Sequence, residues 1–344
     1  MNMKTSNKHG KIIPLVICCS ISAIILTTLC GIFYFRQKLL AAASSNAISY
    51  EKYDKHYALI TSNKDSPFWE SVYEEAKIEA KKHNAYVEYI GKSLSAAYDI
   101  QVLLRIAIDS AVDGIIIEAS ENLEVAELIN EAVEKGIVVI TVLKDSPKSE
   151  RQSFIGINNY NLGQTYGQQV LNIWDEDTRR ILVLMDSNKQ DTNQNVIYSS
   201  IKETILQETD KSKQLDIRTV TVNNENTFSS EEVIRDIIMD TNNLPDIIIC
   251  LNSIDTRCAY QAVVDHNKVG QINILGYYNS EDILKAVQKE IIHSTISIDA
   301  KQMGALCVQA LDEYKTTGRV SNYLPVDTHL ITLKNVNKYL KNEN

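Results

Sequence analysis

The sequence contains little glycine, proline, cysteine or excess positive charge, and each shortage excludes a class of protein. Only 12 Gly and 5 Pro occur in 344 residues, which excludes a collagen-like repeat and a Gly/Pro-rich disordered chain. Six cysteines are too few for a disulfide-rich scaffold of this length, and they form no C-x-x-C pair. The formal net charge is −9, so the chain lacks the excess of cations that sequence-independent nucleic-acid binding requires.

The sequence also lacks the motifs of several enzyme classes. It contains neither the G-x-x-x-x-G-K-[ST] nor the G-x-G-x-x-G loop that cradles a nucleotide phosphate. It contains neither a G-x-S-x-G nucleophile elbow nor an H-E-x-x-H zinc helix, and its six histidines are scattered along the chain. We therefore expect a protein that is not an enzyme and that holds no metal or cofactor.

A long uncharged segment lies near the N-terminus, at residues 12–35. As a helix it would extend about 36 Å, which is enough to cross a hydrocarbon core of about 30 Å with some tilt. Three lysines precede it, namely Lys4, Lys8 and Lys11. This charge bias predicts a single-pass membrane anchor with the N-terminus inside the cell and the remaining chain outside.

A cleaved signal peptide is the alternative for this segment. The apolar core of a signal peptide is usually 7 to 15 residues long, whereas this segment is longer and is followed by the charged sequence FRQK. The small residues Ala41–Ala43 still offer a cleavage site. Residues 41–55 are small and polar and predict a tether.

The three cysteines after this tether, Cys250, Cys258 and Cys307, are expected to be buried thiols because their number is odd and Cys250 lies in an apolar run.

After residue 55 the sequence alternates between short apolar runs and longer amphipathic runs. The short runs are rich in β-branched residues and are apolar on both faces, which is typical of buried parallel strands. The longer runs predict helices, the first of which begins at Ser66-Pro67 with a capping residue and a proline. The expected strands are 56–61, 85–91, 113–119, 136–142, 153–158, 180–186, 215–222, 246–252, 273–278 and 293–298.

This order predicts an α/β fold with two doubly wound parallel-sheet lobes after the N-terminal transmembrane helix. Ligands of open parallel sheets bind beyond the carboxyl ends of the strands. Two such lobes facing each other place these loops on either side of one cleft. The residues that follow each strand are therefore the candidates for a binding site.

At these loops the sequence resembles the type I periplasmic binding proteins for sugars, the ribose/galactose/xylose-binding family. The resemblance covers about residues 56–335 and rests on several segments in a matching order. They are ALITSNKDSPFWESVYEEAKIEA, DGIIIEAS, EKGIVVITV, FIGINNYNLGQTYGQQV, ILGYYNSEDILKAVQKEIIHSTIS and LPVD. Repressors of the LacI type share this fold but begin with a helix-turn-helix, where this chain has an apolar segment, so no binding of nucleic acid is expected.

The resemblance implies a set of ligand contacts at positions that match the family pattern. An aromatic residue in the first loop would stack on the apolar face of a sugar ring. The family's Asp-Arg pair after the fourth strand aligns with Leu143-Lys144, and the Asp of its G-F-D pattern aligns with Tyr278. The implied ligand-binding residues are Ser66, Phe68, Trp69, Lys144, Asn158, Asn195, Asp255, Tyr278 and Asp299.

This set departs from the family pattern because most of the charged contacts to a free sugar are replaced by Asn, Tyr or apolar residues. Buried polar groups set ligand selectivity, since an unmatched one costs about 1–3 kcal/mol. The departure implies a modified sugar or a non-sugar ligand, or a cleft that no longer binds a small molecule.

The predicted division of the chain is a membrane anchor at 1–40, a tether at 41–55 and two lobes. Lobe 1 comprises 56–158 plus about 299–325, and lobe 2 comprises 159–298 plus about 326–344. The predicted function is extracytoplasmic binding of a sugar-like molecule, which is presented to an ABC-type permease or a membrane sensor histidine kinase. The alternative is a surface interaction protein of the same fold with a degenerate cleft.

Overall fold

The computed structural model describes residues 53–340 except 95–97, 188–191, 209–214 and 224–226, together with Thr28 and Gly31. The predicted membrane segment therefore lies outside the described residues apart from those two positions. Within the described part of the chain, no helix has both the length and the hydrophobicity needed to cross a membrane.

Lobe 1 is built on a sheet of six parallel strands in the order β11-β5-β4-β3-β1-β2. The strands are β1 (Lys55–Ile60), β2 (Ala85–Tyr89), β3 (Gly114–Ile117), β4 (Val138–Val142), β5 (Ser153–Gly156) and β11 (Tyr323–Pro325). The helices are α2 (Pro67–Lys82), α3 (Ile100–Asp109), α4 (Leu123–Glu134) and α10 (Ala300–Thr317).

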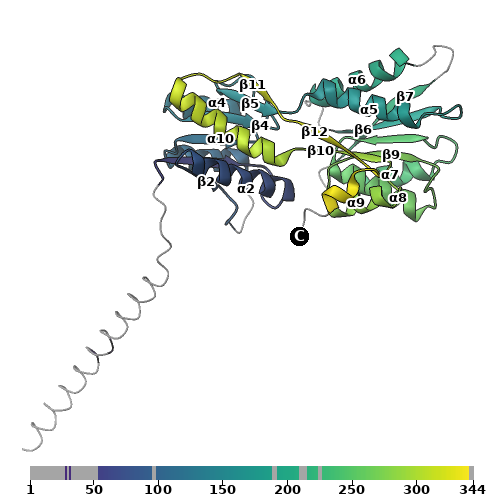
Figure 1. Ribbon diagram of the computed structural model, residues 1–344, viewed down its shortest axis with the longest axis horizontal. Coiled ribbons are helices and arrows are strands. Elements are labelled where there is room, and N and C mark those ends of the chain that lie inside the picture. The colour runs from purple at the N-terminus through teal and green to yellow at the C-terminus, as the bar shows by residue number, and fades with distance from the viewer. Residues whose placement is uncertain are drawn as a thin grey trace, which may run out of the picture. The chain divides into compact units, whose positions relative to one another are not determined.

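The two faces of this sheet are covered by different helix pairs. Helices α2 and α10 lie against each other, as Figure 1 shows, and bury Val72, Met303 and Leu311. Helices α3 and α4 bury Leu104 and Ile129 in a separate cluster. Strand residues that are apolar on both sides fit this arrangement because each side chain packs against one helix pair or the other.

Lobe 2 is built on a second six-stranded sheet in the order β12-β10-β9-β8-β6-β7, in which β12 alone is antiparallel to its neighbour. The strands are β6 (Arg180–Asp186), β7 (Asp216–Val222), β8 (Ile247–Cys250), β9 (Asn273–Tyr277), β10 (Ser294–Ile298) and β12 (Thr328–Thr332). The helices are α5 (Asn159–Ile173), α6 (Thr192–Glu208), α7 (Thr227–Met239), α8 (Ser253–Asp265), α9 (Glu281–Gln288) and α11 (Val336–Leu340).

The predicted two-lobed α/β fold is confirmed, and each of the ten predicted strands overlaps a strand of the structure. Strands β11 and β12 were not predicted. Strand β11 has only three residues, ends at Pro325 and has at least partly exposed side chains, so it is too short to give a strand pattern. The three cysteines of the lobes are free and buried, as predicted.

The chain passes between the two lobes at three places. It leaves β5 of lobe 1 for α5, it returns from β10 of lobe 2 to α10, and it passes from β11 to β12. Backbone hydrogen bonds connect the three crossing segments. The Val326 N–H donates to the Gly156 carbonyl at 2.9 Å, and the Asp299 N–H donates to the Asp327 carbonyl at 3.0 Å.

Candidate functional site

The carboxyl ends of the strands carry polar side chains in both lobes. In lobe 1, Ser62 lies just beyond β1, Glu118 just beyond β3 and Lys144 just beyond β4. In lobe 2, Asn252 lies just beyond β8 and Tyr278 directly follows β9. Because the strands of each sheet that bear these residues are parallel, their carboxyl ends meet at one edge of the sheet.

Glu118 organises the lobe 1 part of this site. Its side chain is only 5% exposed, and its carboxylate forms an ion pair at 3.0 Å with the ammonium of Lys144, which is 58% exposed. The other oxygen accepts hydrogen bonds from the Ser62 hydroxyl at 2.6 Å and from the Ser62 N–H at 2.9 Å. These three donors compensate the buried carboxylate, which holds Lys144 at the strand ends.

The neighbouring carboxylate of Asp145 is engaged elsewhere. It accepts two hydrogen bonds from the Arg151 guanidinium, at 2.6 and 2.7 Å, and a third at 2.6 Å from the Thr141 hydroxyl. Arg151 also donates to the Asn322 side chain at 2.5 Å, next to β11. Asp145 therefore stabilises the edge of lobe 1, and the cation of this region that reaches solvent at the strand ends is Lys144.

The corresponding edge of lobe 2 is built around Asn252. Its side-chain oxygen caps α8 by accepting from the Asp255 N–H at 2.8 Å, and its amide group donates to the Asp255 carboxylate at 2.7 Å. Asp255 itself is fully buried. Behind this edge, the Tyr166 hydroxyl donates to the carbonyls of Cys250 and Gly276 at 3.1 and 3.0 Å, which fixes β8 and β9 relative to α5.

Two backbone positions at the strand ends have an unusual conformation. Leu143, after β4, has φ = 62°, and Tyr278, after β9, has φ = 85°. Each donates its N–H to the adjacent strand, Leu143 to Ile155 at 2.8 Å and Tyr278 to Ile296 at 2.7 Å. Positive φ in a branched or aromatic residue is strained, and such strain concentrates at functional sites. Leu143 and Tyr278 occupy equivalent positions in the two lobes, which supports a single site formed by both lobes.

Aromatic side chains connect the two lobes. The ring of Phe68, in α2 of lobe 1, lies edge-on to Tyr278 of lobe 2 with centroids 6.4 Å apart. Phe68 is half-buried and also contacts Trp69, with centroids 5.2 Å apart. Trp69 is only 4% exposed and belongs to the core of lobe 1. Phe68 and Tyr278 are therefore the aromatic side chains best placed for a ligand, whereas Trp69 is buried in the core.

The other predicted site residues lie at helix starts near the strand ends. Asn158 caps α5 by accepting from the Asn161 N–H at 3.1 Å. Ser66 precedes α2 but forms no capping hydrogen bond through its side chain, and Asn195 lies exposed in the first turn of α6. Their roles in binding stay predictions.

Asp299 lies at the crossing from β10 to α10. Its carboxylate caps α10 by accepting from the Gln302 N–H at 2.9 Å and also contacts the His329 ring at 3.1 Å. Burial raises the pKa of this carboxyl, but the Gln302 N–H and His329 outweigh that effect, so its pKa lies below the usual value. Asp299 therefore joins the two lobes at a crossing, which is a structural task that the sequence prediction did not include.

Sequence reasoning missed Glu118. The expected strand over 113–119 includes this residue, so it was not among the residues that follow a strand. The sequence feature that could have identified it is a carboxylate directly after an apolar four-residue strand. A charge at that point must find partners, because a buried unpaired carboxylate is strongly unfavourable.

Residues 57–319 match the family model that is described as a periplasmic binding protein domain. The chain belongs to this family. The predicted resemblance is thereby confirmed, and the polar strand ends of the two lobes lie where a periplasmic binding protein of two open sheets would hold a ligand. No curated protein matches the sequence significantly.

Solved structures of this periplasmic binding protein fold cover most of the chain. The XylFII–LytSN complex matches with 25% identity and a TM-score of 0.68 over 81% of this chain and 98% of that one. A sugar-binding protein of a sugar ABC transporter from Bacillus halodurans matches with 23% identity and a TM-score of 0.73, over 83% and 100%. A carbohydrate transporter from Acidothermus cellulolyticus in complex with myo-inositol matches with 20% identity and a TM-score of 0.67, over 83% and 97%.

Proposed function

We propose that the chain is an extracytoplasmic solute-binding protein that holds a neutral, polyhydroxylated, sugar-like molecule between its two lobes. The observation that carries this proposal is the pairing of polar strand ends in both lobes with the aromatic contact between Phe68 and Tyr278. Hydroxyl-rich rings have one apolar face and a polar rim, and they match aromatic faces combined with hydrogen-bonding groups.

The charges at the strand ends favour an uncharged ligand. In lobe 1 the cation of Lys144 is neutralised by Glu118 at 3.0 Å. In lobe 2, Asp186 ends β6 and Asp255 lies buried behind Asn252. A phosphate or carboxylate group on the ligand would meet the compensated cation of Lys144 and these carboxylates, so we expect phosphorylated sugars and sugar acids to bind poorly.

Ligand binding would stabilise a closed arrangement of the lobes. A ligand shifts the equilibrium between open and closed forms only by its difference in affinity for the two. A change from 1:99 to 99:1 requires about 5.5 kcal/mol. An aromatic stacking contact together with several hydrogen bonds from both lobes is of that order.

Thermal unfolding tests this proposal. We expect at least one compound among myo-inositol, arabinose, xylose, ribose, glucose and galactose to raise the melting temperature of the wild-type protein, since a ligand that binds only the folded state stabilises it. Phe68→Ala should remove this shift while the lobes stay folded. Phe228→Ala, which changes an exposed phenylalanine of α7, is the matched control and should leave the shift unchanged.

The alternative of a degenerate site is an outcome of the same experiment. If no neutral compound of this class moves the melting temperature, the proposal of a sugar-like ligand is wrong and a surface interaction role gains. If a compound binds but Phe68→Ala leaves the shift intact, the site lies away from the strand ends. Either result is visible without knowledge of the downstream partner.

The closed form would be read by a membrane protein, either an ABC permease or a sensor histidine kinase. Structural neighbours support both possibilities: one is the XylFII–LytSN complex, and another is the sugar-binding protein of a Bacillus halodurans sugar ABC transporter.

We further propose that residues 12–35 anchor the protein with its lobes outside the cell. A cysteine at Ser44 should react with an impermeant thiol reagent on intact cells, and labelling only after permeabilisation would reverse this orientation.

A further inference from the structure

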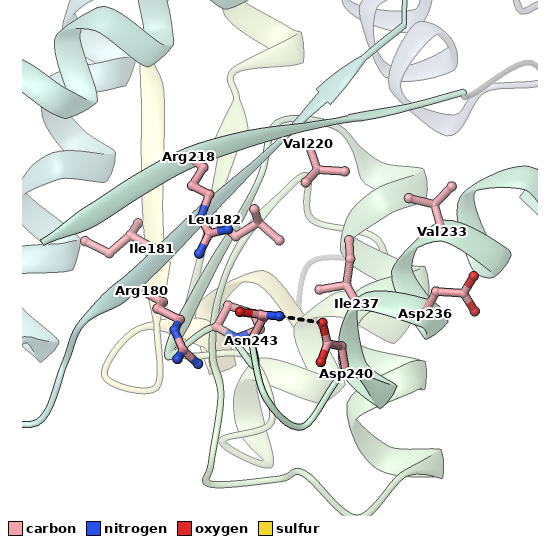
Figure 2. A pocket seen from close by; sticks show the side chains of 11 residues that line it. Arg180, Ile181, Leu182, Arg218, Val220, Val233, Asp236, Ile237, Asp240 and Asn243 are labelled. Atoms are coloured by element: carbon pink, nitrogen blue, oxygen red, sulfur yellow. Dashed lines mark hydrogen bonds between the residues drawn. The ribbon is translucent and has the colours of Figure 1, made fainter.

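A cavity of about 390 Å³ lies beside strand β7 in lobe 2, away from the strand ends that form the candidate site. Its walls are apolar side chains of β6, β7 and α7, including Leu182, Val220 and Ile237. Figure 2 shows the guanidinium groups of Arg180 and Arg218 on one side of the cavity and the carboxylate of Asp236 on the other. The cavity therefore combines an apolar wall with separated charges of both signs.

Strand β7 forms one edge of the sheet of lobe 2. The Asp216 N–H donates to the Arg179 carbonyl at 2.8 Å, and the Val222 carbonyl accepts from the Ser187 N–H at 2.9 Å. The even-numbered residues of β7 thus bond to β6. Because successive residues of a strand direct their backbone groups to opposite sides, Ile217, Thr219 and Thr221 direct theirs away from the sheet.

Within its described residues, this strand is neither short nor interrupted by proline, the features that commonly prevent strand pairing. Exposed edges are commonly short, interrupted by proline or rich in charge, and β11 of lobe 1 is three residues long and ends in Pro325. Strand β7 has seven residues, no proline and five β-branched side chains, and its two charged residues, Asp216 and Arg218, form an ion pair with each other. The outward carbonyl of Ile217 accepts a hydrogen bond from the Tyr198 hydroxyl at 3.1 Å, and its second lone pair is left for the N–H of a partner strand.

We propose that β7 is a dimerisation edge, at which a second copy of this chain pairs antiparallel with the same strand about a two-fold axis at Thr219. This inference does not depend on the proposed ligand or function. The outward backbone groups fix the register, since Thr219 must face Thr219 and Ile217 must face Thr221 for the hydrogen bonds to form. Arg218 of one copy then lies opposite Val220 of the other.

Charge complementarity selects a second copy as the occupant. Val220 is a wall of the cavity whose rim carries Asp236, a side chain that is 68% exposed and whose contact with its neighbour Arg235 is 3.3 Å long. Antiparallel pairing brings Arg218 of each copy to the cavity of the other and toward Asp236, which replaces Asp216 of its own strand as the partner of this guanidinium. The two-fold axis generates the contact between Arg218 and Asp236 twice, so each copy contributes one cation and one carboxylate to the interface.

Cysteine cross-linking of the full chain in membranes tests the register. In a background in which Cys18, Cys19 and Cys30 are serine, Thr219→Cys should form a disulfide-linked dimer on oxidation. Facing residues of such a pair have Cα atoms about 5.5 Å apart, within disulfide range. Thr221→Cys is the matched control, because it is equally exposed on the same side of the strand but lies about 14 Å from its own symmetry mate in this register.

We expect Thr219→Cys to cross-link at least tenfold faster than Thr221→Cys. Equal rates would indicate random collision, and a faster reaction of Thr221→Cys would indicate another register; either result overturns the proposal. Absence of cross-linking by both variants also overturns it, provided that both cysteines react with a maleimide.

A charge exchange tests the contact between Arg218 and Asp236 independently. Arg218→Glu and Asp236→Arg should each weaken the homodimer at least tenfold, as measured by sedimentation in detergent. A mixture of the two variants should form heterodimers, because each of the two contacts then pairs opposite charges. An interaction within one copy cannot produce this restoration, so failure of the mixture to associate would contradict the proposed contact.

Discussion

Replacing Gly304 with alanine is expected to lower the free energy of unfolding by about 2–3 kcal/mol. Gly304 lies in α10 where this helix crosses α2, and a Cβ atom there would lie 2.3 Å from the Val72 carbonyl oxygen and 3.0 Å from the Ala76 nitrogen. Both atoms belong to the helix backbone and cannot rotate away as a side chain would. The two helices must therefore separate, and the apolar contacts of Val72 and Met303 are lost.

Chemical denaturation of the wild-type protein and the variant measures this effect. Lys301→Ala, on an exposed position of the same helix, is the control and should change the free energy of unfolding by less than about 0.5 kcal/mol. Hydrogen exchange should become faster in α2 and α10 of the Gly304 variant and stay unchanged in lobe 2. A Gly304→Ala protein as stable as the wild type would show that the two helices are not in backbone contact.

The architecture of the lobes could be predicted from the sequence because it follows from local patterns. Runs such as DGIIIEA and DIIIC are apolar on both faces and identify buried parallel strands. Strands β11 and β12 escaped prediction because they follow no such pattern, and β12 is held in place by antiparallel pairing with β10. Pairing partners far apart in the sequence are not visible in a local pattern.

The candidate site was predictable in its position but not in the direction of its side chains. Parallel strands predict that ligands meet their carboxyl ends, and Lys144 and Tyr278 do lie there. The sequence does not show that Trp69 is buried whereas its neighbour Phe68 contacts Tyr278. Helix orientation decides which of two adjacent aromatic residues faces the core, and that orientation depends on the packing of α2 against α10.

Lys144 and Asp145 illustrate the same limit with charged residues. They are adjacent in the sequence, yet Lys144 pairs with Glu118 at the strand ends and Asp145 pairs with Arg151. Both residues follow Leu143, whose positive φ turns the chain after β4 and so places them where these partners lie. A backbone conformation that branched residues rarely adopt cannot be predicted from a propensity.

Arg151→Met is expected to lower the free energy of unfolding by about 2–4 kcal/mol, because it leaves the carboxylate of Asp145 poorly solvated and without its cation. The side chains of Arg151 and Asp145 are 10% and 20% exposed, so solvent screens their interaction only partly. Loss of the hydrogen bond from Arg151 to Asn322 also weakens the attachment of β11 to β5. Denaturant titration of the variant measures the total.

Lys144→Met is the matched variant, since it also removes a cation that pairs with a carboxylate of lobe 1. We expect it to cost less than Arg151→Met, about 1–2 kcal/mol, because Lys144 makes one ion pair through an exposed ammonium, whereas Arg151 donates to both oxygens of Asp145 and to Asn322. Lys144→Met should weaken binding of a sugar-like ligand at least tenfold. Arg151→Met should leave the ligand affinity of the folded protein within about threefold of the wild-type value. If Lys144→Met proved the more destabilising of the two variants, the Lys144–Glu118 pair would be a structural element of lobe 1 and its assignment to the ligand site would fail.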